Sequence, residues 1–342
     1  NAGHDLIVFD NYSNSSPKAL ERVIELARIP QKEVSSRLEI VQGDVRDEVT
    51  LDRLFLDGAE KGRPLEAVIH FAGLKAVAES LLHPCSYWSV NVCGSQALLA
   101  RMEAHGCKTI VFSSSATLYG SAKASPIPET APVRPVNPYG ATKAAVEMML
   151  ADMAGCSGDV APIQVSQNGW RIARLRYFNP VGAHPSGRIG EDPSGIPNNL
   201  FPILSQLAVK RSTSFKVFGS DWPTPDGTGV RDYIHVMDVA EGHSVALDVL
   251  LSSPPQLITL NLGSGKGYSV FEVLKAFEKA SGITVDYELA SRRQGDVAIT
   301  VADPDFAFKR LGWRPKLKLS DMCRDVWTWQ SANPLGFQNE AA

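Results

Sequence analysis

The chain has 342 residues, of which 44% are hydrophobic and 21% are charged, a composition that fits one large globular domain or two unequal ones and excludes a disordered or fibrous protein. The formal charge of −3 provides no overall basic field, so nucleic acid is not expected as a partner and a phosphate ligand must be held by local groups. The five cysteines form no disulfide framework, the seven histidines form no metal-binding cluster, and no run is long and apolar enough to cross a membrane, which together predict a cytoplasmic protein without a metal.

Short β-branched runs alternate with amphipathic stretches across the first half of the sequence. This alternation predicts an α/β fold with a doubly wound parallel sheet, similar to a Rossmann fold. Ligands of such folds collect at the carboxyl ends of the strands, where this sequence places small and polar residues. The predicted strands are Leu6–Phe9, Leu38–Val41, Ala67–Phe71, Thr109–Phe112 and Arg171–Tyr177.

The start of the chain departs from a complete dinucleotide-binding unit. Such a unit has a strand and a glycine-rich turn about 20 residues before the acidic residue that binds the ribose. Here only nine residues precede Asp10. We therefore expect that the first strand and the glycine-rich loop are missing because the chain is truncated, and the alternative is a chain that begins with a strand.

Proline and glycine become dense after residue 180, which predicts a second, smaller lobe. We expect one domain over residues 1–180 and a lobe over 181–342, with a segment near 235–262 that returns to the first domain. Leu257–Leu262 is a further predicted strand, and Tyr268–Lys279 a predicted helix. The glycine-rich segment 263–267 between them has the spacing of neither phosphate-binding loop, so we interpret it as a turn.

Two Tyr-x-x-x-Lys pairs are candidates for a catalytic base. On a helix this spacing places a phenol beside an ammonium group, which lowers the pKa of the phenol and lets it act as a base. Tyr119 and Lys123 precede a proline-rich run that opposes a helix, whereas Tyr139 and Lys143 stand among apolar residues at helical spacing. Tyr139 and Lys143 are therefore the predicted catalytic pair, and Tyr119 is expected to pack or to bind.

Hydroxyl side chains follow the predicted strand Thr109–Phe112, over residues 113–117. A Ser/Thr-rich turn is the alternative interpretation of this segment. Together with a phenolate base on the following helix, however, a hydroxyl such as that of Ser115 completes the triad of an enzyme that oxidises an alcohol with a nicotinamide cofactor.

Several collinear strings resemble the extended short-chain dehydrogenase/reductase superfamily, and most closely the UDP-galactose (UDP-glucose) 4-epimerases. These strings are His70–Val77, Phe112–Gly120, Asn137–Lys143, Arg176–Gly187, Gly190–Asp192, Gly195–Leu200, Asp226–His235 and Arg292–Asp296. Related dehydratases and decarboxylases carry a carboxylate where Ala116 or Thr117 stands here. Without that acid–base group, elimination and decarboxylation are not expected.

The resemblance implies that the protein interconverts UDP-galactose and UDP-glucose by reversible oxidation at C4 of the hexose, with NAD recycled rather than consumed. Tyr139, hydrogen-bonded to Ser115 and assisted by Lys143, would take the proton of the C4 hydroxyl. A homodimer packed through helices around Gln96–His105 and Tyr139–Ala154 is also implied. Two alternatives stay open: an epimerase of UDP-N-acetylhexosamines or a 4-oxidising relative, and a UDP-sugar-binding protein that is inactive because the glycine loop is absent.

The resemblance also implies which residues bind the two ligands. The expected NAD contacts lie in residues 1–180 and are Asp10, Asn11, Asn14, Asp44, Val45, Phe71, Ala72, Gly73, Lys75, Asn91, Lys143 and Tyr177. The expected UDP-sugar contacts lie mainly in residues 181–342 and are Ser115, Ala116, Thr117, Tyr177, Phe178, Asn179, Asn198, Asn199, Leu200, Lys216, Val217, Phe218, Arg231, Arg293 and Asp296. Arginine at two of these positions suits a diphosphate, because its guanidinium group is a fork-shaped donor.

Thr300, four residues after Asp296, is expected to border the substituent at C2 of the sugar. Family members carry either a tyrosine or a small side chain at this position. Threonine leaves room for an acetamido group, which implies that UDP-GlcNAc and UDP-GalNAc are also substrates. The alternative is that Thr300 packs in its strand and a neighbouring side chain closes the space.

Overall fold

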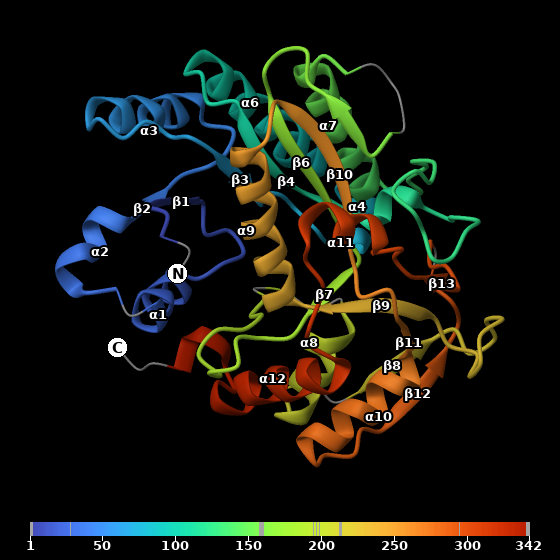
Figure 1. Cartoon of the computed structure of the whole chain (residues 1–342). Helices are drawn as coiled ribbons and strands as arrows, with labels where there is room; N and C mark the ends of the chain where they lie inside the picture. The colour runs from blue at the N-terminus through green and yellow to red at the C-terminus, as the bar shows by residue number, and fades with distance from the viewer. Residues whose placement is uncertain are drawn as a thin grey trace.

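Parallel strands with helices on both faces form most of the first half of the chain (Figure 1). The computed structural model describes residues 3–27, 29–156, 161–193, 195, 197, 199–211, 214–293 and 295–339. No helix within these ranges has the length and apolarity needed to cross a membrane. The predicted α/β, Rossmann-like fold is confirmed.

A five-stranded sheet positions the predicted catalytic residues. Its strand order is β3 (Val68–His70), β4 (Thr109–Ser115), β6 (Arg171–Tyr177), β10 (Gln256–Leu262) and β5 (Ile163–Val165). The first four strands are parallel, and β5 is antiparallel to β10. Because Tyr177 is opposite both Ser115 and Leu262, the carboxyl ends of three strands meet at one edge.

The two faces of this sheet are covered by different helices, as the alternation of side chains along a strand requires. Ile110 and Phe112 of β4 pack against α3 (Glu48–Glu60), α6 (Gly94–Ala104) and α7 (Pro138–Ala154). Val111 faces the other way. It packs against a core to which α9 (Val236–Ser252), α11 (Asp305–Leu311) and Trp313 contribute.

The first two strands form a sheet of their own. β1 (Leu6–Asp10) pairs in parallel with β2 (Leu38–Gln42), and each has no other strand partner among the residues that the structure describes. In Figure 1 this pair lies on the β3 side of the five-stranded sheet. The connecting helices are α1 (Pro17–Ala27) and α2 (Gln31–Arg37).

The predicted strands are confirmed with ends that differ by at most one residue, except for β4. β4 runs three residues further, because Ser113–Ser115 stay paired with Leu175–Tyr177 of β6. The predicted helix at 268–279 is found as α10 (Val270–Ser281). It begins later because Ser269 and Glu272 form a capping box.

A second core lies under smaller sheets of the second half. β9 (Val230–His235) pairs with β7 (Asn179–Val181), β11 (Gly267–Ser269) and β13 (Ile299–Thr300), while β8 (Phe215–Phe218) pairs with β12 (Tyr287–Ala290). The apolar core beneath them is shared with α8 (Leu200–Ala208), α10 and α12 (Leu319–Ala332). Shorter elements are α4 (Val77–Leu82), α5 (Pro84–Tyr87), the π-helical η1 (Trp88–Cys93), and the 3-10 turns η2 (Ala116–Tyr119) and η3 (Gly336–Asn339).

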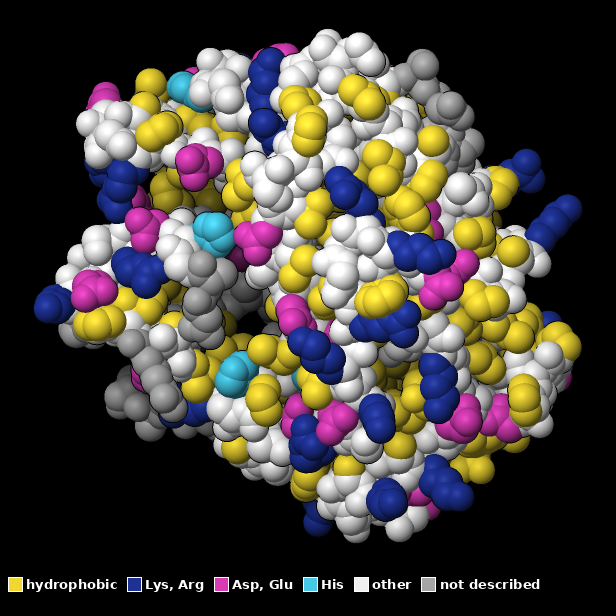
Figure 2. Space-filling model, viewed as in Figure 1, with side chains coloured by type: hydrophobic (Ala, Val, Ile, Leu, Met, Phe, Trp, Pro, Cys, Tyr) yellow, Lys and Arg dark blue, Asp and Glu magenta, His cyan; other side chains and the backbone are white. Residues whose placement is uncertain are grey.

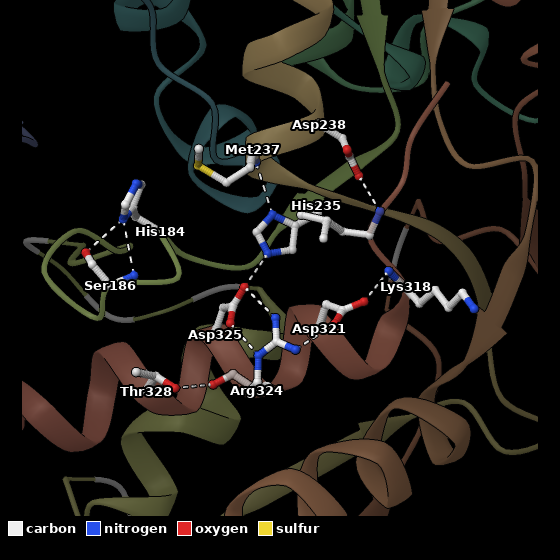
Figure 3. A network of polar contacts seen from close by, with 11 residues as sticks. His184, Ser186, His235, Met237, Asp238, Lys318, Asp321, Arg324, Asp325 and Thr328 are labelled. Atoms are coloured by element: carbon white, nitrogen blue, oxygen red, sulfur yellow. Dashed lines mark hydrogen bonds and ion pairs between the residues drawn. The ribbon is translucent and has the colours of Figure 1, made fainter. Parts of the chain in front are cut away.

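A buried histidine joins β9 to α12 (Figure 3). The Nδ1 atom of His235 accepts from the backbone N–H of Met237 at 3.1 Å, so Nε2 carries the proton and donates to Asp325 Oδ2, also at 3.1 Å. Burial lowers the pKa of His235, which favours this neutral form. Gly182 is required beside it, because a Cβ there would lie 2.8 Å from Nε2 and its φ of +97° disfavours other residues.

Candidate active site

The predicted catalytic pair lies at the start of α7. Asn137 caps this helix by accepting from the backbone N–H of Gly140 at 2.8 Å, and Pro138 occupies the first turn. These two residues fix where the helix begins. Tyr139 and Lys143, four residues apart, therefore share one face of the helix.

The end of β4 contacts this face of α7 through three consecutive serines. The Nζ atom of Lys143 donates to the backbone oxygen of Ser113 at 2.7 Å. The hydroxyl of Ser114 donates to Glu147 at 2.5 Å. The side chain of Ser115 interacts with the Tyr139 hydroxyl, and its own hydroxyl lies 2.9 Å from Thr117 Oγ1. Tyr139, Lys143 and Ser115, predicted as one triad, are thus brought together.

Burial acts in opposite directions on the two titratable groups. It raises the pKa of Tyr139, and the hydrogen bond from Ser115 opposes this rise by favouring the phenolate. Burial lowers the pKa of Lys143 to about 8, while the carboxylate of Glu147 favours the charged form. The ammonium group also lies 4.9 Å from the centre of the Phe112 ring. Lys143 is therefore a buried cation at neutral pH, one turn from the phenol.

Tyr177 closes another side of the site, at the end of β6. Its hydroxyl is hydrogen-bonded to Nε2 of His243 on α9. Nδ1 of His243 is 2.8 Å from the backbone oxygen of Val239, so Nδ1 is the protonated nitrogen and Nε2 accepts from the tyrosine. Burial lowers the pKa of His243 to about 4, which keeps the ring neutral. Phe71 lies against this imidazole with the ring centres 4.8 Å apart, and 58% of Phe71 is exposed.

Asp10, the acid expected to bind the ribose, ends β1, and Asp44, expected to flank the adenine, follows β2 by two residues. Asp10 accepts from the backbone N–H of Tyr12 at 2.7 Å and from Ser15 Oγ at 2.8 Å. Asp44 is held by Arg46 through two contacts of 2.7 and 2.8 Å and by Asn11 at 3.1 Å. The pKa of Asp44 is lowered, mainly by the hydrogen bond from Arg46.

Other expected cofactor contacts are used by the protein itself. Val45 is buried in the core, where a Cβ on Gly94 would approach it to 2.5 Å. The side-chain amide of Asn91 accepts from the backbone N–H of Leu74 at 2.7 Å and donates to the backbone oxygen of Leu74 at 3.0 Å. Asn91 thereby fixes the loop that holds Ala72, Gly73 and Lys75. Within this loop a Cβ on Gly73 would lie 3.7 Å from Lys143 Nζ, and Lys75 pairs with Glu191 at 2.9 Å. Asn14 lies between β1 and α1.

The expected diphosphate-binding arginines converge on one acid. Arg231 lies 3.8 Å from Asp296, and Arg293 lies 3.4 Å from it. The Arg293 guanidinium also lies 4.8 Å from the centre of the Phe218 ring. Thr300 is directly opposite Arg231 in the sheet. Residues that are far apart in sequence are thus assembled in one place.

The remaining expected substrate residues are distributed around these groups. Phe178 and Ala116 are buried, Thr117 lies in η2, and Asn179 begins β7. Asn199 and Leu200 lie at the start of α8, with Lys216 and Val217 on β8. The side chain of Val217 is buried in the second core. Asn198 lies outside the described residues.

The second Tyr-x-x-x-Lys pair has a different environment. Tyr119 lies in the short turn η2, and the segment that contains Lys123 has no regular structure. The hydroxyl of Tyr119 donates to Asn261 Oδ1 at 2.7 Å and accepts from Arg176 at 2.9 Å. Both of its bonds are therefore made within the protein.

Sequence reasoning missed two residues next to the site. Glu147 stands four residues after Lys143, and this continued spacing could have indicated it. His243 has no such signal, since only the fold brings α9 to the end of β6.

On the face shown in Figure 2, basic and acidic side chains are interspersed.

Comparisons with known proteins give one consistent result. A family model described as GDP-mannose 4,6 dehydratase matches residues 1–326. The UDP-glucose 4-epimerase of Bacillus subtilis is 49% identical over 340 residues, which cover 99% of this chain and 93% of that protein. The UDP-glucose 4-epimerase of Mus musculus is 46% identical over 347 residues, with coverages of 99% and 93%.

Solved structures agree with these relatives. The UDP-glucose 4-epimerase of Bifidobacterium longum, in complex with NAD+ and UDP, superimposes with a TM-score of 0.88 at 45% identity, covering 98% of this chain and 94% of that one. The Stenotrophomonas maltophila enzyme, with bound NAD and formylated UDP-arabinopyranose, gives a TM-score of 0.87 at 43% identity, with coverages of 97% and 92%. The expected absence of a first strand and glycine loop is not borne out by these comparisons. Since both the sequence and the fold match over nearly their whole length, the chain belongs to the UDP-glucose 4-epimerase family of extended short-chain dehydrogenases/reductases.

Proposed function

We propose that this protein interconverts UDP-galactose and UDP-glucose through reversible oxidation at C4 of the hexose, with NAD as its resident cofactor. The observation that carries the proposal is the contact of Tyr139 and Lys143 with the end of β4, in a chain 49% identical to an enzyme of this name. NAD and UDP occur together in the related B. longum structure.

The residues at the ends of β1, β2 and β3 fit NAD. Asp10 offers carboxylate oxygens to the ribose hydroxyls, which favours NAD over a cofactor with a phosphate at that position, and Asp44 would flank the adenine. Gly73 keeps the path beside Lys143 free of a side chain. Phe71 and Tyr177 would border the nicotinamide. When bound, NAD would supply the nicotinamide ring that accepts a hydride from C4 and returns it.

The chain itself moves the proton and holds the nucleotide. Tyr139, as phenolate, takes the proton of the C4 hydroxyl through Ser115, and the Lys143 cation stabilises the phenolate. Arg231 and Arg293 hold the diphosphate, with Asp296 between the two guanidinium groups. A tightly held UDP and a loosely held hexose let the 4-keto sugar turn and present its other face.

We infer that the two parts of the chain bind different ligands. Residues 1–180 bind NAD, and residues 181–342 bind mainly the UDP-sugar. Strand β10 pairs with β6 in the five-stranded sheet, and helix α9 packs against that sheet, although both lie in the second half of the chain. This supports the proposed return of residues near 235–262 to the first domain.

We further propose that acetylated sugars are accepted. Thr300 on β13 lies opposite Arg231, so a small side chain stands beside the proposed diphosphate site. Measurement of epimerisation with UDP-GlcNAc as well as UDP-glucose tests this range. No turnover of the acetylated sugar by an enzyme that converts UDP-glucose would contradict it.

We also propose a cytoplasmic homodimer that packs through helices around Gln96–His105 and Tyr139–Ala154. Large apolar side chains are exposed on α4, η1 and α7, namely Leu81, Leu82, Trp88 and Met148, with 43 to 75% of each accessible. Such a patch favours an interface. Cys85 and Cys93 are free and exposed, which suits a reducing compartment. Sedimentation of wild type and Met148→Glu tests the dimer.

The alternative of a non-enzymatic UDP-sugar-binding protein is not favoured by the match to epimerases. The deciding experiment incubates the purified protein with UDP-galactose, measures UDP-glucose, and assays NAD released by denaturation. Turnover with bound NAD is expected. UDP binding without NAD and without turnover would support the alternative and contradict the proposal.

A further inference from the structure

A buried ion-pair network lies one helical turn after the predicted catalytic pair on α7. Glu147, only 3% exposed, accepts from Arg176 at 2.6 and 3.0 Å and from Ser114 at 2.5 Å. Arg174 lies 3.8 Å from the same carboxylate and donates to the backbone oxygen of Glu147 at 3.2 Å. None of these residues has a part in the proposed chemistry, although burying such charges is costly unless they are well paired.

The network continues the catalytic face of α7. Tyr139, Lys143 and Glu147 follow each other at intervals of four residues, so they share one face of the helix. Each of them contacts a different member of the Ser113–Ser115 segment. Glu147 thus makes the third of the three contacts that set how α7 lies against β4.

Arg176 connects this carboxylate to the rest of the sheet. Its Nη1 atom donates to the Tyr119 hydroxyl and to the backbone oxygen of Glu129, both at 2.9 Å. Tyr119 in turn donates to Asn261 on β10 at 2.7 Å. The Glu147 carboxylate is therefore fixed by groups from β4, β6 and, through Tyr119, β10.

We propose that Glu147 is a positioning residue of the epimerase reaction, which holds Tyr139 and Lys143 in register with β4 and keeps the ammonium group of Lys143 charged. The inference rests on the proposed epimerase function. Glu147 acts through Lys143 and Tyr139.

The charges around Lys143 make Glu147 the source of this effect. Titratable groups on the elements packed around it include Tyr139 and Glu147 of α7, His70 of β3, Glu79 of α4, Tyr87 of α5, Cys93 of η1, Tyr119 of η2, and Arg174, Arg176 and Tyr177 of β6. Burial keeps His70 neutral and raises the pKa of the Tyr87, Tyr119 and Tyr177 phenols. Glu147 is the acid whose charge favours protonated Lys143.

The test is the pH profile of kcat/KM for UDP-galactose in the NAD-loaded enzyme. Glu147→Gln keeps the shape of the side chain and removes its charge, so the alkaline limb is expected to move down by about one pH unit. Glu147→Asp keeps the charge and should keep the limb in place. Ser205→Ala is the matched control, because it removes a buried hydroxyl bonded to Gln330 in the second lobe at 3.0 Å.

The outcomes separate the two proposals. An active wild type whose alkaline limb is unchanged in folded Glu147→Gln would overturn the positioning role alone, and an inactive wild type would overturn both proposals. If the single variant does not fold because Arg176 is left unpaired, Glu147→Gln with Arg176→Gln replaces the ion pair by a neutral one. The same downward shift is then expected, and its absence again overturns the role.

Discussion

Phenylalanine in place of tyrosine removes one hydroxyl group and little else, so Tyr139→Phe and Tyr119→Phe form a matched pair. The Tyr139 hydroxyl is bonded to Ser115 and is the proposed base. Its removal is expected to lower kcat by at least about 10²-fold, the scale of a positioned acid–base group. UDP should still bind, because Arg231 and Arg293 are unchanged.

Tyr119→Phe should instead lower stability. The lost hydroxyl leaves the Asn261 amide oxygen and the Arg176 guanidinium each short of one buried partner. A neutral hydrogen bond contributes about 0.5–1.5 kcal/mol and one to a charged group about 1.5–3 kcal/mol. The free energy of unfolding should therefore fall by about 2–4.5 kcal/mol. The rate constant kcat should change little, since the two bonds from Arg176 to Glu147 remain.

Both quantities are measured on both variants. UDP-glucose formation from UDP-galactose is followed by coupling to UDP-glucose dehydrogenase, and stability by urea denaturation. A variant Tyr139→Phe that keeps its activity while Tyr119→Phe loses it would refute the choice of base. An unchanged unfolding free energy in Tyr119→Phe would show that the two hydrogen bonds of the Tyr119 hydroxyl do not stabilise the protein.

Four further outcomes are expected. Because burial lowers the pKa of Lys143 to about 8, kcat/KM should fall as the pH rises through that value and the cation is lost, which a pH profile in the wild type measures; a flat profile to pH 10 contradicts it. Arg293→Ala should raise KM for UDP-sugars by roughly 10- to 100-fold, with a smaller effect on kcat, because a charge-assisted contact to phosphate is lost. Thr300→Tyr should slow UDP-GlcNAc turnover by about tenfold or more and spare UDP-glucose, and equal turnover of both would disprove the pocket argument. Gly182→Ala should lower Tm by several degrees, since its Cβ meets His235 at 2.8 Å in a left-handed backbone conformation, and an unchanged Tm would show that His235 can move.

Local signals in the sequence are the basis for predicting Tyr139 and Lys143 as the catalytic pair. Asn137, Pro138 and the helical spacing after them are neighbours in the chain, so Tyr139 could be chosen over Tyr119 without knowledge of the fold. The strand Thr109–Phe112 was likewise apparent from its apolar run. Its continuation to Ser115 was not, because hydroxyl residues become strand only through pairing with β6.

Contacts between distant segments could not be derived in this way. Arg231 and Asp296 meet because β9 and the loop before β13 are adjacent in space. Glu147 pairs with Arg176 on β6, and nothing in the sequence around either residue indicates the other. Family resemblance supplied the expected roles of many residues. It did not indicate that Asn91 holds the loop around Leu74, since that depends on where the π-helical segment η1 places the amide.

The separate pair of β1 and β2 has a consequence for local stability. Leu38 is the single fully buried residue of these two strands, whereas all but one residue of β4 is buried. A ladder with so little burial opens at low free energy, so its amide hydrogens should exchange with solvent well before those of β4. A dinucleotide bound beside Asp10 and Asp44 would slow this exchange by a factor of 1 + [L]/Kd, where [L] is its free concentration. Hydrogen exchange at β1 and β2 therefore offers a measure of dinucleotide binding that needs no turnover.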